Sequence, residues 1–251
     1  HPLEILAPEQ SPSFLFFIKQ KIKILEKLGL DYYFEQEFTE DFSNLSFKEF
    51  IYGILIKRIG VRHIVVGSDF KFGKDQTGNT EKLKKLDDTY HIDTTIIPVI
   101  KKKSSKISST YIRKLIKNGK VDEVEKYLGR NYKIEGRVVT GEGRGRKLGI
   151  PTANLNLTTD YVLPPKGVYA AVAHHNDETF KAVVNFGEKP TFSAKDYTIE
   201  VHILDLEKDL YNEMLEVELY EFIREEKRFS NKDDLISQIK SDILYTRNIL
   251  C

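Results

Sequence analysis

Tryptophan is absent from the chain, and cysteine occurs only once, at Cys251. A single terminal cysteine excludes an internal disulfide and any cysteine-rich metal site, so a reduced, cytoplasmic setting is the simplest expectation. No apolar run approaches the roughly 18 residues that a membrane-spanning helix needs. The formal net charge is only +1. The sequence therefore predicts neither a nucleic-acid partner nor a membrane partner.

The chain is long enough for two domains, and its two halves carry different patterns. In the first half, helical and extended patterns alternate, which is typical of an open α/β sheet. Ser46 and Glu49 have the spacing of a capping box, and 64–66 is a continuous apolar run typical of a buried parallel strand. The predicted helices are 15–28, 46–59, 109–117 and 121–128, and the predicted strands are 64–66 and 94–99.

The second half is dominated by short strands that follow one another without helices between them, which favours an antiparallel barrel or sandwich. A last helix begins near Ser230. We place the domain boundary after Leu128, giving an α/β domain over 1–128 and an all-β domain over 129–251. The predicted strands are 133–140, 168–173, 180–185, 198–204 and 215–222. The predicted apolar face of the last helix is Leu235, Ile236, Ile239, Ile243 and Leu244.

A loop rich in glycine and basic residues, 141–149, follows the first strand of the second half. Glycines allow backbone N–H groups to approach a phosphate closely, and Arg144, Arg146 and Lys147 add positive charge. The loop is not a Walker motif, because no Gly-Lys-Ser/Thr follows. A solvated turn is the alternative interpretation of such a loop.

The next residues favour a metal–phosphate site. Pro151 fixes its own φ and disposes the chain toward an extended conformation, in which residues two apart point the same way. Thr152 and Asn154 would then direct a hydroxyl and an amide oxygen to one point. Neutral oxygens of this kind suit Mg²⁺, which completes its shell with water and phosphate oxygens. Alternatively, both side chains satisfy backbone groups in a turn.

The stretch GEGRGRKLGIPTANL resembles the glycine-rich loop and Pro-Thr-Ala-Asn motif of riboflavin kinase. Further matches follow in the expected order over most of 129–250: Gly-Val-Tyr at 167–169, then 184–191, 199–204 and 222–229. The resemblance implies an antiparallel β-barrel kinase domain with a C-terminal helix, and riboflavin, FMN and ATP as partners. It gives no expectation of oligomeric state.

The resemblance also implies roles for individual residues. Thr152 and Asn154 would hold Mg²⁺, and Glu200 would accept the proton of the ribityl 5′-hydroxyl. Strand alternation places Glu200 on the face opposite Ile199 and Val201. An ordinary exposed strand position is the alternative for Glu200. The residues expected at the ATP phosphates are Gly143, Arg144, Gly145, Arg146, Lys147 and Pro151.

Two more residues of the second half are candidates for flavin contact. Asn185 lies at a strand end, and Arg224 has Phe222 and Phe229 nearby, so its guanidinium could stack on a flat ring. An ion pair with a neighbouring Glu is the alternative for Arg224.

The first half resembles the adenylyltransferase part of the bacterial bifunctional riboflavin kinase/FAD synthetase, a Rossmann-like nucleotidyltransferase domain. The stretch 66–74 resembles its flavin-side loop, with Asp69 and Phe70 as flavin contacts, although Phe70 could equally be a core residue. The stretch 107–113 resembles a phosphate motif at a helix start, which predicts ATP contacts from Ser109, Thr110 and Arg113.

The family's His-x-Gly-His signature does not occur in the chain, and His1 is not preceded by a methionine. We therefore expect an incomplete nucleotidyltransferase domain, FMN formation, and little conversion of FMN to FAD. A segment upstream of His1 would reverse that last expectation. The rival hypothesis is a flavin- or nucleotide-binding module without turnover.

Overall fold

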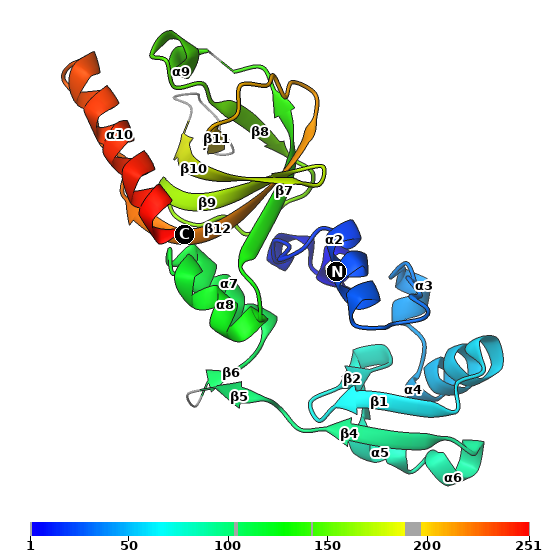
Figure 1. Ribbon diagram of the computed structural model, residues 1–251. Coiled ribbons are helices and arrows are strands. Elements are labelled where there is room, and N and C mark those ends of the chain that lie inside the picture. The colour runs from blue at the N-terminus through cyan, green and yellow to red at the C-terminus, as the bar shows by residue number, and fades with distance from the viewer. Residues whose placement is uncertain (1, 103–104, 142, 189–196, 251) are drawn as a thin grey trace. The chain divides into compact units, whose positions relative to one another are not determined.

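The computed structural model describes residues 2–102, 105–141, 143–188 and 197–250 (Figure 1). The chain divides into two compact units, one formed by His1–Pro12 with Tyr32–Ile107 and the other by Ser13–Asp31 with Ser108–Cys251. The second unit therefore includes segments that precede residue 129. The predicted domain boundary after residue 128 stays a prediction.

The first unit contains a two-stranded parallel sheet, formed by β1 (His63–Gly67) and β4 (Asp93–Ile97). The predicted capping box is present, because Ser46 accepts from the Glu49 N–H and Glu49 accepts from the Ser46 N–H. The core of this unit consists of Ile51, Ile64, Phe72, Leu83, Leu86 and Ile92. The remaining elements are α1 (Pro2–Leu6), η1 (Pro8–Gln10), α3 (Glu40–Ser43), α4 (Phe47–Glu49), η2 (Phe50–Ile59), β2 (Lys71–Phe72), η3 (Lys74–Gln76), β3 (Gly78–Asn79), α5 (Thr80–Lys84), α6 (Asp87–Tyr90), β5 (Lys101–Lys102) and β6 (Ser105–Lys106).

The predicted burial of the run 64–66 is wrong in part. The strand exists and pairs in parallel, as predicted, and Ile64 is buried. However, Val65 is 62% exposed. Successive strand residues point to opposite faces, and in the described residues only one face of this two-stranded sheet is covered, so alternate side chains reach solvent.

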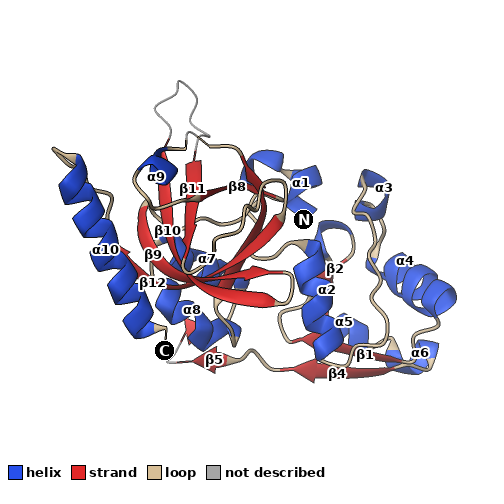
Figure 2. Cartoon of the chain, turned by 45° about the horizontal axis from the view of Figure 1, so that its top comes forward, coloured by secondary structure: helices blue, strands red, loops and turns tan. Residues whose placement is uncertain are grey.

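The second unit is built on a closed barrel with strand order β10-β11-β8-β7-β12-β9, and all six pairings are antiparallel (Figure 2). This confirms the predicted all-β fold and five predicted strands. The sequence predicts the sixth strand, β8, only as an extended segment, and the structure shows that it closes the barrel between β7 and β11. The strands are β7 (Tyr132–Val139), β8 (Ala153–Leu157), β9 (Gly167–His175), β10 (Glu178–Glu188), β11 (Tyr197–Ile203) and β12 (Met214–Arg224).

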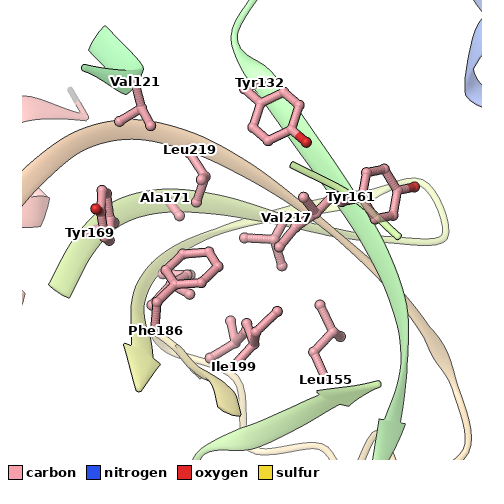
Figure 3. Close-up of a cluster of buried hydrophobic side chains, with 14 of the residues drawn as sticks. Val121, Tyr132, Leu155, Tyr161, Tyr169, Ala171, Phe186, Ile199, Val217 and Leu219 are labelled. Atoms are coloured by element: carbon pink, nitrogen blue, oxygen red, sulfur yellow. The ribbon is translucent and has the colours of Figure 1, made fainter. Parts of the chain in front are cut away.

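Inward-facing side chains from every part of the barrel meet in one core. Tyr169 packs edge-on against Phe186, with 5.3 Å between ring centroids, and Ile199 and Val217 fill the space beside them (Figure 3). The inward positions alternate with outward ones along each strand, because the side-chain period of a strand is two. The outward positions of the same strands are thus available for a site.

In the part of this unit that the structure describes, five helices occur: α2 (Ile18–Lys27), α7 (Ser109–Lys117), α8 (Val121–Leu128), α9 (Arg144–Lys147) and α10 (Lys232–Ile249). The predicted helices 109–117 and 121–128 have the observed bounds. Gln20 attaches α2 to the barrel. Its side chain accepts a hydrogen bond from the Tyr161 hydroxyl (3.2 Å) and donates one to Glu216 (3.3 Å).

The predicted apolar face of the last helix, α10, is wrong in part. Leu244 is 61% exposed, whereas Asp242 and Thr246 are buried. The reason lies on the neighbouring strand, where Arg224 of β12 extends toward α10 and pairs with Asp242. A buried charge is tolerated when a partner neutralises it and satisfies its hydrogen bonds.

Candidate active site

Four of the predicted site residues lie in one row across the outer face of the barrel. Asn154 of β8 is the register partner of Glu200 of β11, and Glu200 is the partner of Asn185 of β10. Asn185 pairs with Val168 of β9, and Val168 pairs with Arg224 of β12. Directly opposed residues project on the same face of a sheet. Residues far apart in the sequence are thus brought together by strand register alone.

Thr152 joins this row just before β8 begins. Its hydroxyl donates to Glu200 Oε2 across 3.3 Å. Pro151 favours an extended approach to the strand, which carries Thr152 to the same side as Asn154. The predicted convergence of Thr152 and Glu200 is present in the structure, although the chemical roles of the two residues stay predictions.

The glycine-rich loop lies directly on the Pro-Thr-Ala-Asn segment. A Cβ added at Gly141 would lie 2.0 Å from Asn154 Nδ2, and one added at Gly145 would lie 2.3 Å from the Ile150 carbonyl oxygen. A Cβ at Gly145 would meet backbone, so this position requires glycine, whereas a Cβ at Gly141 would displace the Asn154 side chain. Gly143 precedes the single helical turn α9 with a φ of 67°.

The cationic side chains of the loop are described only in part. The Arg146 guanidinium lies 3.7 Å from Asp209 Oδ2 and 5.9 Å from the centre of the Tyr211 ring. The side chains of Arg144 and Lys147, which the sequence predicts at the ATP phosphates, lie outside the part that the structure describes.

Two cavities meet at Thr152, which lines both. The first, about 240 Å³, lies on the outer face of the barrel and is bounded by the row residues Glu200, Asn185 and Arg224 together with α10. Its apolar wall consists of Leu148, Ile150, Val168, Val183, Phe229, Leu235 and Ile239. One hydroxyl with a cavity on each side is an arrangement in which a group can pass from one ligand to another.

The second cavity, about 420 Å³, is bounded by Val138, Val201, Arg146 and Pro151. The stretch 206–211 closes its other side. Val138 and Val201 face the barrel core, so this cavity lies at an end of the barrel, unlike the first. Asn154 lines neither of these two cavities, because its amide lies beneath Gly141.

Arg224 is held by an acidic residue that the sequence pattern did not indicate. Its Nε and Nη2 donate to the Asp242 carboxylate at 2.7–3.0 Å, and its guanidinium lies 6.0 Å from the centre of the Phe229 ring. The alternative prediction that Arg224 forms an ion pair is therefore confirmed, but the predicted partner is wrong: it is Asp242 on α10 and not a neighbouring Glu. Nearby, Asn185 donates to Glu226 at 3.2 Å.

The predicted phosphate motif of the first half falls at the start of α7. Ser108 is the N-cap and accepts from the Tyr111 N–H, which places Ser109 and Thr110 in the first turn. One nitrogen of Arg113 is already engaged, because its Nε donates to the Ser13 carbonyl at 2.9 Å. Burial lowers the pKa of Arg113 from its ordinary value.

The two predicted flavin contacts of the first unit have partners within that unit. Asp69 forms an ion pair with Lys106, and the hydrogen bond from Lys106 lowers the pKa of Asp69. Phe70 stacks on Phe72 with ring centroids 5.1 Å apart and packs against the core, which favours the alternative that it is a core residue.

Sequence reasoning missed three polar side chains of the outer-face cavity besides Asp242. His202 lines it from β11, and Glu226 and Lys227 line it from the segment after β12. For His202 a signal existed, because it follows Glu200 by two positions and so shares its face. For Asp242 no signal existed, since a charged residue in an amphipathic helix is expected to face solvent.

Comparison with known proteins agrees with the barrel fold. Residues 128–250 match the riboflavin kinase family model, and residues 1–111 match the FAD synthetase family model. The fold and the matches together define a flavin kinase joined to a nucleotidyltransferase. Within the residues that the structure describes, the search for helices found none of the length and hydropathy needed to cross a membrane.

The relatives carry both modules. The bifunctional riboflavin kinase/FMN adenylyltransferase of Buchnera aphidicola (Schizaphis graminum) is 39% identical over 96% of this chain and 78% of its own. Those of Bacillus subtilis and Escherichia coli K12 are 37% and 36% identical and are covered over 77% and 79% of their lengths. A solved structure described as a macrolide-efflux protein from Streptococcus pneumoniae superimposes with a TM-score of 0.86 at 31% identity, covering 95% of this chain and 79% of that one.

The chain belongs to the family of bifunctional riboflavin kinase/FMN adenylyltransferases. It is an enzyme that uses ATP to phosphorylate riboflavin to FMN, and its family supports FAD synthesis as well.

Proposed function

We propose that Glu200 is the base of riboflavin phosphorylation and that Thr152 and Asn154 lie at the metal–triphosphate. The observation that carries this proposal is the 3.3 Å contact between the Thr152 hydroxyl and Glu200, at the meeting point of the two cavities. Phosphoryl transfer depends on positioning and on charge stabilisation, so donor and acceptor must meet at one place.

The two cavities have different lining, which supports different ligands. The outer-face cavity combines the flat-ring partners Arg224 and Phe229 with apolar residues of α10, and it takes riboflavin with Asn185 as a polar contact. The cavity at the barrel end contains Arg146 and Pro151 and takes ATP. The residues of the loop, Gly143 to Lys147, then cover the phosphates.

Glu200 performs its role as a carboxylate within reach of the outer-face cavity. It accepts the proton of the ribityl 5′-hydroxyl while that oxygen forms a bond to the γ-phosphorus, and the bond from the γ-phosphorus to the bridging oxygen breaks to release ADP. Thr152 fixes the direction of the carboxylate through its hydroxyl. Strand register keeps Asn185 beside Glu200, so the proposed flavin contact and the proposed base project from the same face of the barrel.

The donor set at this place fits Mg²⁺. The Thr152 hydroxyl and the Asn154 amide oxygen are hard oxygen donors, which Mg²⁺ prefers. Among the described residues no group of three His, Cys, Asp or Glu could hold a metal, so phosphate oxygens and water would complete the shell. When bound, the ion neutralises charge on the transferring phosphate.

For the adenylyltransferase reaction we propose that Ser109 and Thr110 contact ATP phosphates. They lie in the first turn of the nine-residue helix α7, where free N–H groups and the helix dipole favour an anion. Arg113 would assist from the next turn, and Asp69 with Phe70 would contact the flavin. A cytoplasmic setting without nucleic-acid or membrane partners also belongs to the proposal, supported by the single cysteine and the near-zero net charge.

The metal assignment is tested by titrating Mg²⁺ while FMN formation from riboflavin and ATP is followed by chromatography. Thr152→Ala and Asn154→Ala should raise the Mg²⁺ concentration for half-maximal rate by roughly tenfold or more. Asn156→Ala is the matched control, since Asn156 is exposed on the same strand, two residues beyond Asn154. Wild-type Mg²⁺ dependence in both variants would contradict the assignment.

A further inference from the structure

His202 contacts the backbone of the Pro-Thr-Ala-Asn segment. Its Nδ1 lies 2.7 Å from the carbonyl oxygen of Pro151. His202 lies two residues after Glu200 on β11, on the same outer face, and lines the same cavity. The imidazole therefore lies beside the proposed base and holds the residue that precedes Thr152.

The chemistry of this contact shows which ring nitrogen carries a hydrogen. A carbonyl oxygen only accepts hydrogen bonds, so Nδ1 carries the hydrogen and donates. The neutral ring then has its lone pair on Nε2, while the protonated ring still donates from Nδ1. The contact with Pro151 is available to both forms of His202.

The contact lies where backbone pairing stops. In the described residues, the register between β8 and β11 comprises Ala153 with Val201 and Asn154 with Glu200. Pro151 and Thr152 precede that register, and side chains of β11 hold them instead: His202 binds the Pro151 carbonyl, and Glu200 accepts from Thr152. Two side chains on one face of one strand thus replace the missing ladder bonds.

We propose that His202 is a positioning residue for phosphoryl transfer. By binding the Pro151 carbonyl it fixes the peptide that leads into Thr152, and thereby keeps the Thr152 hydroxyl at Glu200 and at the metal–triphosphate. This inference rests on the proposed roles of Thr152 and Glu200. It assigns His202 no contact with the reacting atoms.

The test uses two isosteres that place an amide N–H at different ring positions. In His202→Asn the side-chain N–H falls near the place of Nδ1 and can still donate to Pro151. In His202→Gln it falls near the place of Nε2 and cannot. His202→Leu removes the donor altogether while keeping the bulk.

Riboflavin kinase turnover is measured for the full chain at saturating ATP and Mg²⁺, together with KM for riboflavin. We expect His202→Gln and His202→Leu to lower kcat by about ten- to a hundredfold, the effect of displacing a reacting group by about 1 Å. KM for riboflavin should change by less than about threefold, because the proposed flavin contacts Asn185 and Arg224 are unchanged. His202→Asn should recover most of the turnover.

Equal kcat for the Asn and Gln variants would overturn the proposal, as would a loss confined to KM or to thermal stability. Failure of the underlying site assignment is detected separately with Glu200→Gln. If that variant alone keeps full turnover, the roles of Thr152 and Glu200 are wrong whatever His202 does. If it loses turnover, adding His202→Gln to it should cost much less than in the wild-type chain, because both changes act on one contact. Full additivity would contradict the positioning role.

Discussion

Arg224 and Asp242 form three hydrogen bonds of 2.7–3.0 Å between the end of β12 and the middle of α10. Asp242 is 2% exposed, and Gln238 donates a further bond to it at 2.9 Å. Because both partners line the outer-face cavity, the pair fixes one wall of that cavity to the barrel. The last helix is thus held at the site by charge as well as by apolar contact.

Breaking this pair should destabilise the protein strongly. Asp242→Asn leaves the Arg224 cation, whose side chain is 14% exposed, without its charged partner, and removal of one member of a buried pair costs about 3–5 kcal/mol. The free energy of unfolding in urea measures the effect. The control is Asp205→Asn, which removes an exposed pair with Arg247 on the same helix and should change stability little. Equal stability of the two variants would contradict the structural role given to Asp242.

A second outward-facing side chain of β12, the Glu218 carboxylate, predicts a dependence of stability on pH. Burial would raise the pKa of Glu218, but hydrogen bonds from His174, Asn131 and Lys133, with the charge of Lys133, outweigh it and lower the pKa to about 2. The ordinary value is 4.5. A carboxyl whose pKa falls on folding stabilises the folded state above the unfolded pKa, and this contribution is lost as the pH falls from about 4.5 toward 2.

Glu218→Gln should therefore be less stable than wild type at pH 6, and the difference should shrink as the pH falls to 3. Urea midpoints at pH 6, 4 and 3 measure it. Glu178→Gln, at an exposed position at the start of β10, should retain the wild-type pH dependence. A constant difference between Glu218→Gln and wild type over this range would rule out the linkage.

The glycine-rich loop offers a prediction about activity. Gly145→Ala places a Cβ 2.3 Å from the Ile150 carbonyl and 3.3 Å from Thr152 Oγ1, so the loop or the Pro-Thr-Ala-Asn segment must move. We expect kcat for FMN formation to fall roughly tenfold or more, since small displacements of reacting groups are costly. The midpoint of thermal unfolding should remain close to that of wild type.

Gly53→Ala is the matched control for the loop variant. Gly53 lies in η2 with open space around its Cα, so an added methyl group meets no atom within 4 Å. Its kinase activity should equal that of wild type. Wild-type turnover in Gly145→Ala would show that the close packing of the loop on Ile150 and Thr152 is not needed for catalysis.

The fold class and most elements could be predicted from the sequence because local patterns determine them. Alternation identified five barrel strands, and the bounds of α7 and α8 follow from apolar periodicity closed by Gly119 and Gly129. The strand β8 was seen only as an extended segment, because its residues Ala153 to Leu157 alternate apolar and amide side chains that also suit a turn.

The site could be predicted where motifs are local and not where tertiary pairs decide. The convergence of Thr152 and Glu200 followed from the family motif and strand parity. The partner of Arg224 did not, because Asp242 lies 18 positions away on a helix and only packing determines which helical face is buried. The exposure of Val65 likewise depends on what covers the sheet.

The central claim is that Glu200 takes the proton from riboflavin, and turnover of Glu200→Gln tests it most directly. The amide keeps the size of the side chain but cannot accept the proton, so kcat for FMN formation should fall roughly a hundredfold or more. Riboflavin binding, measured by quenching of flavin fluorescence, should persist, and Glu188→Gln at the exposed end of β10 should behave as wild type. Unchanged turnover in Glu200→Gln would contradict the account.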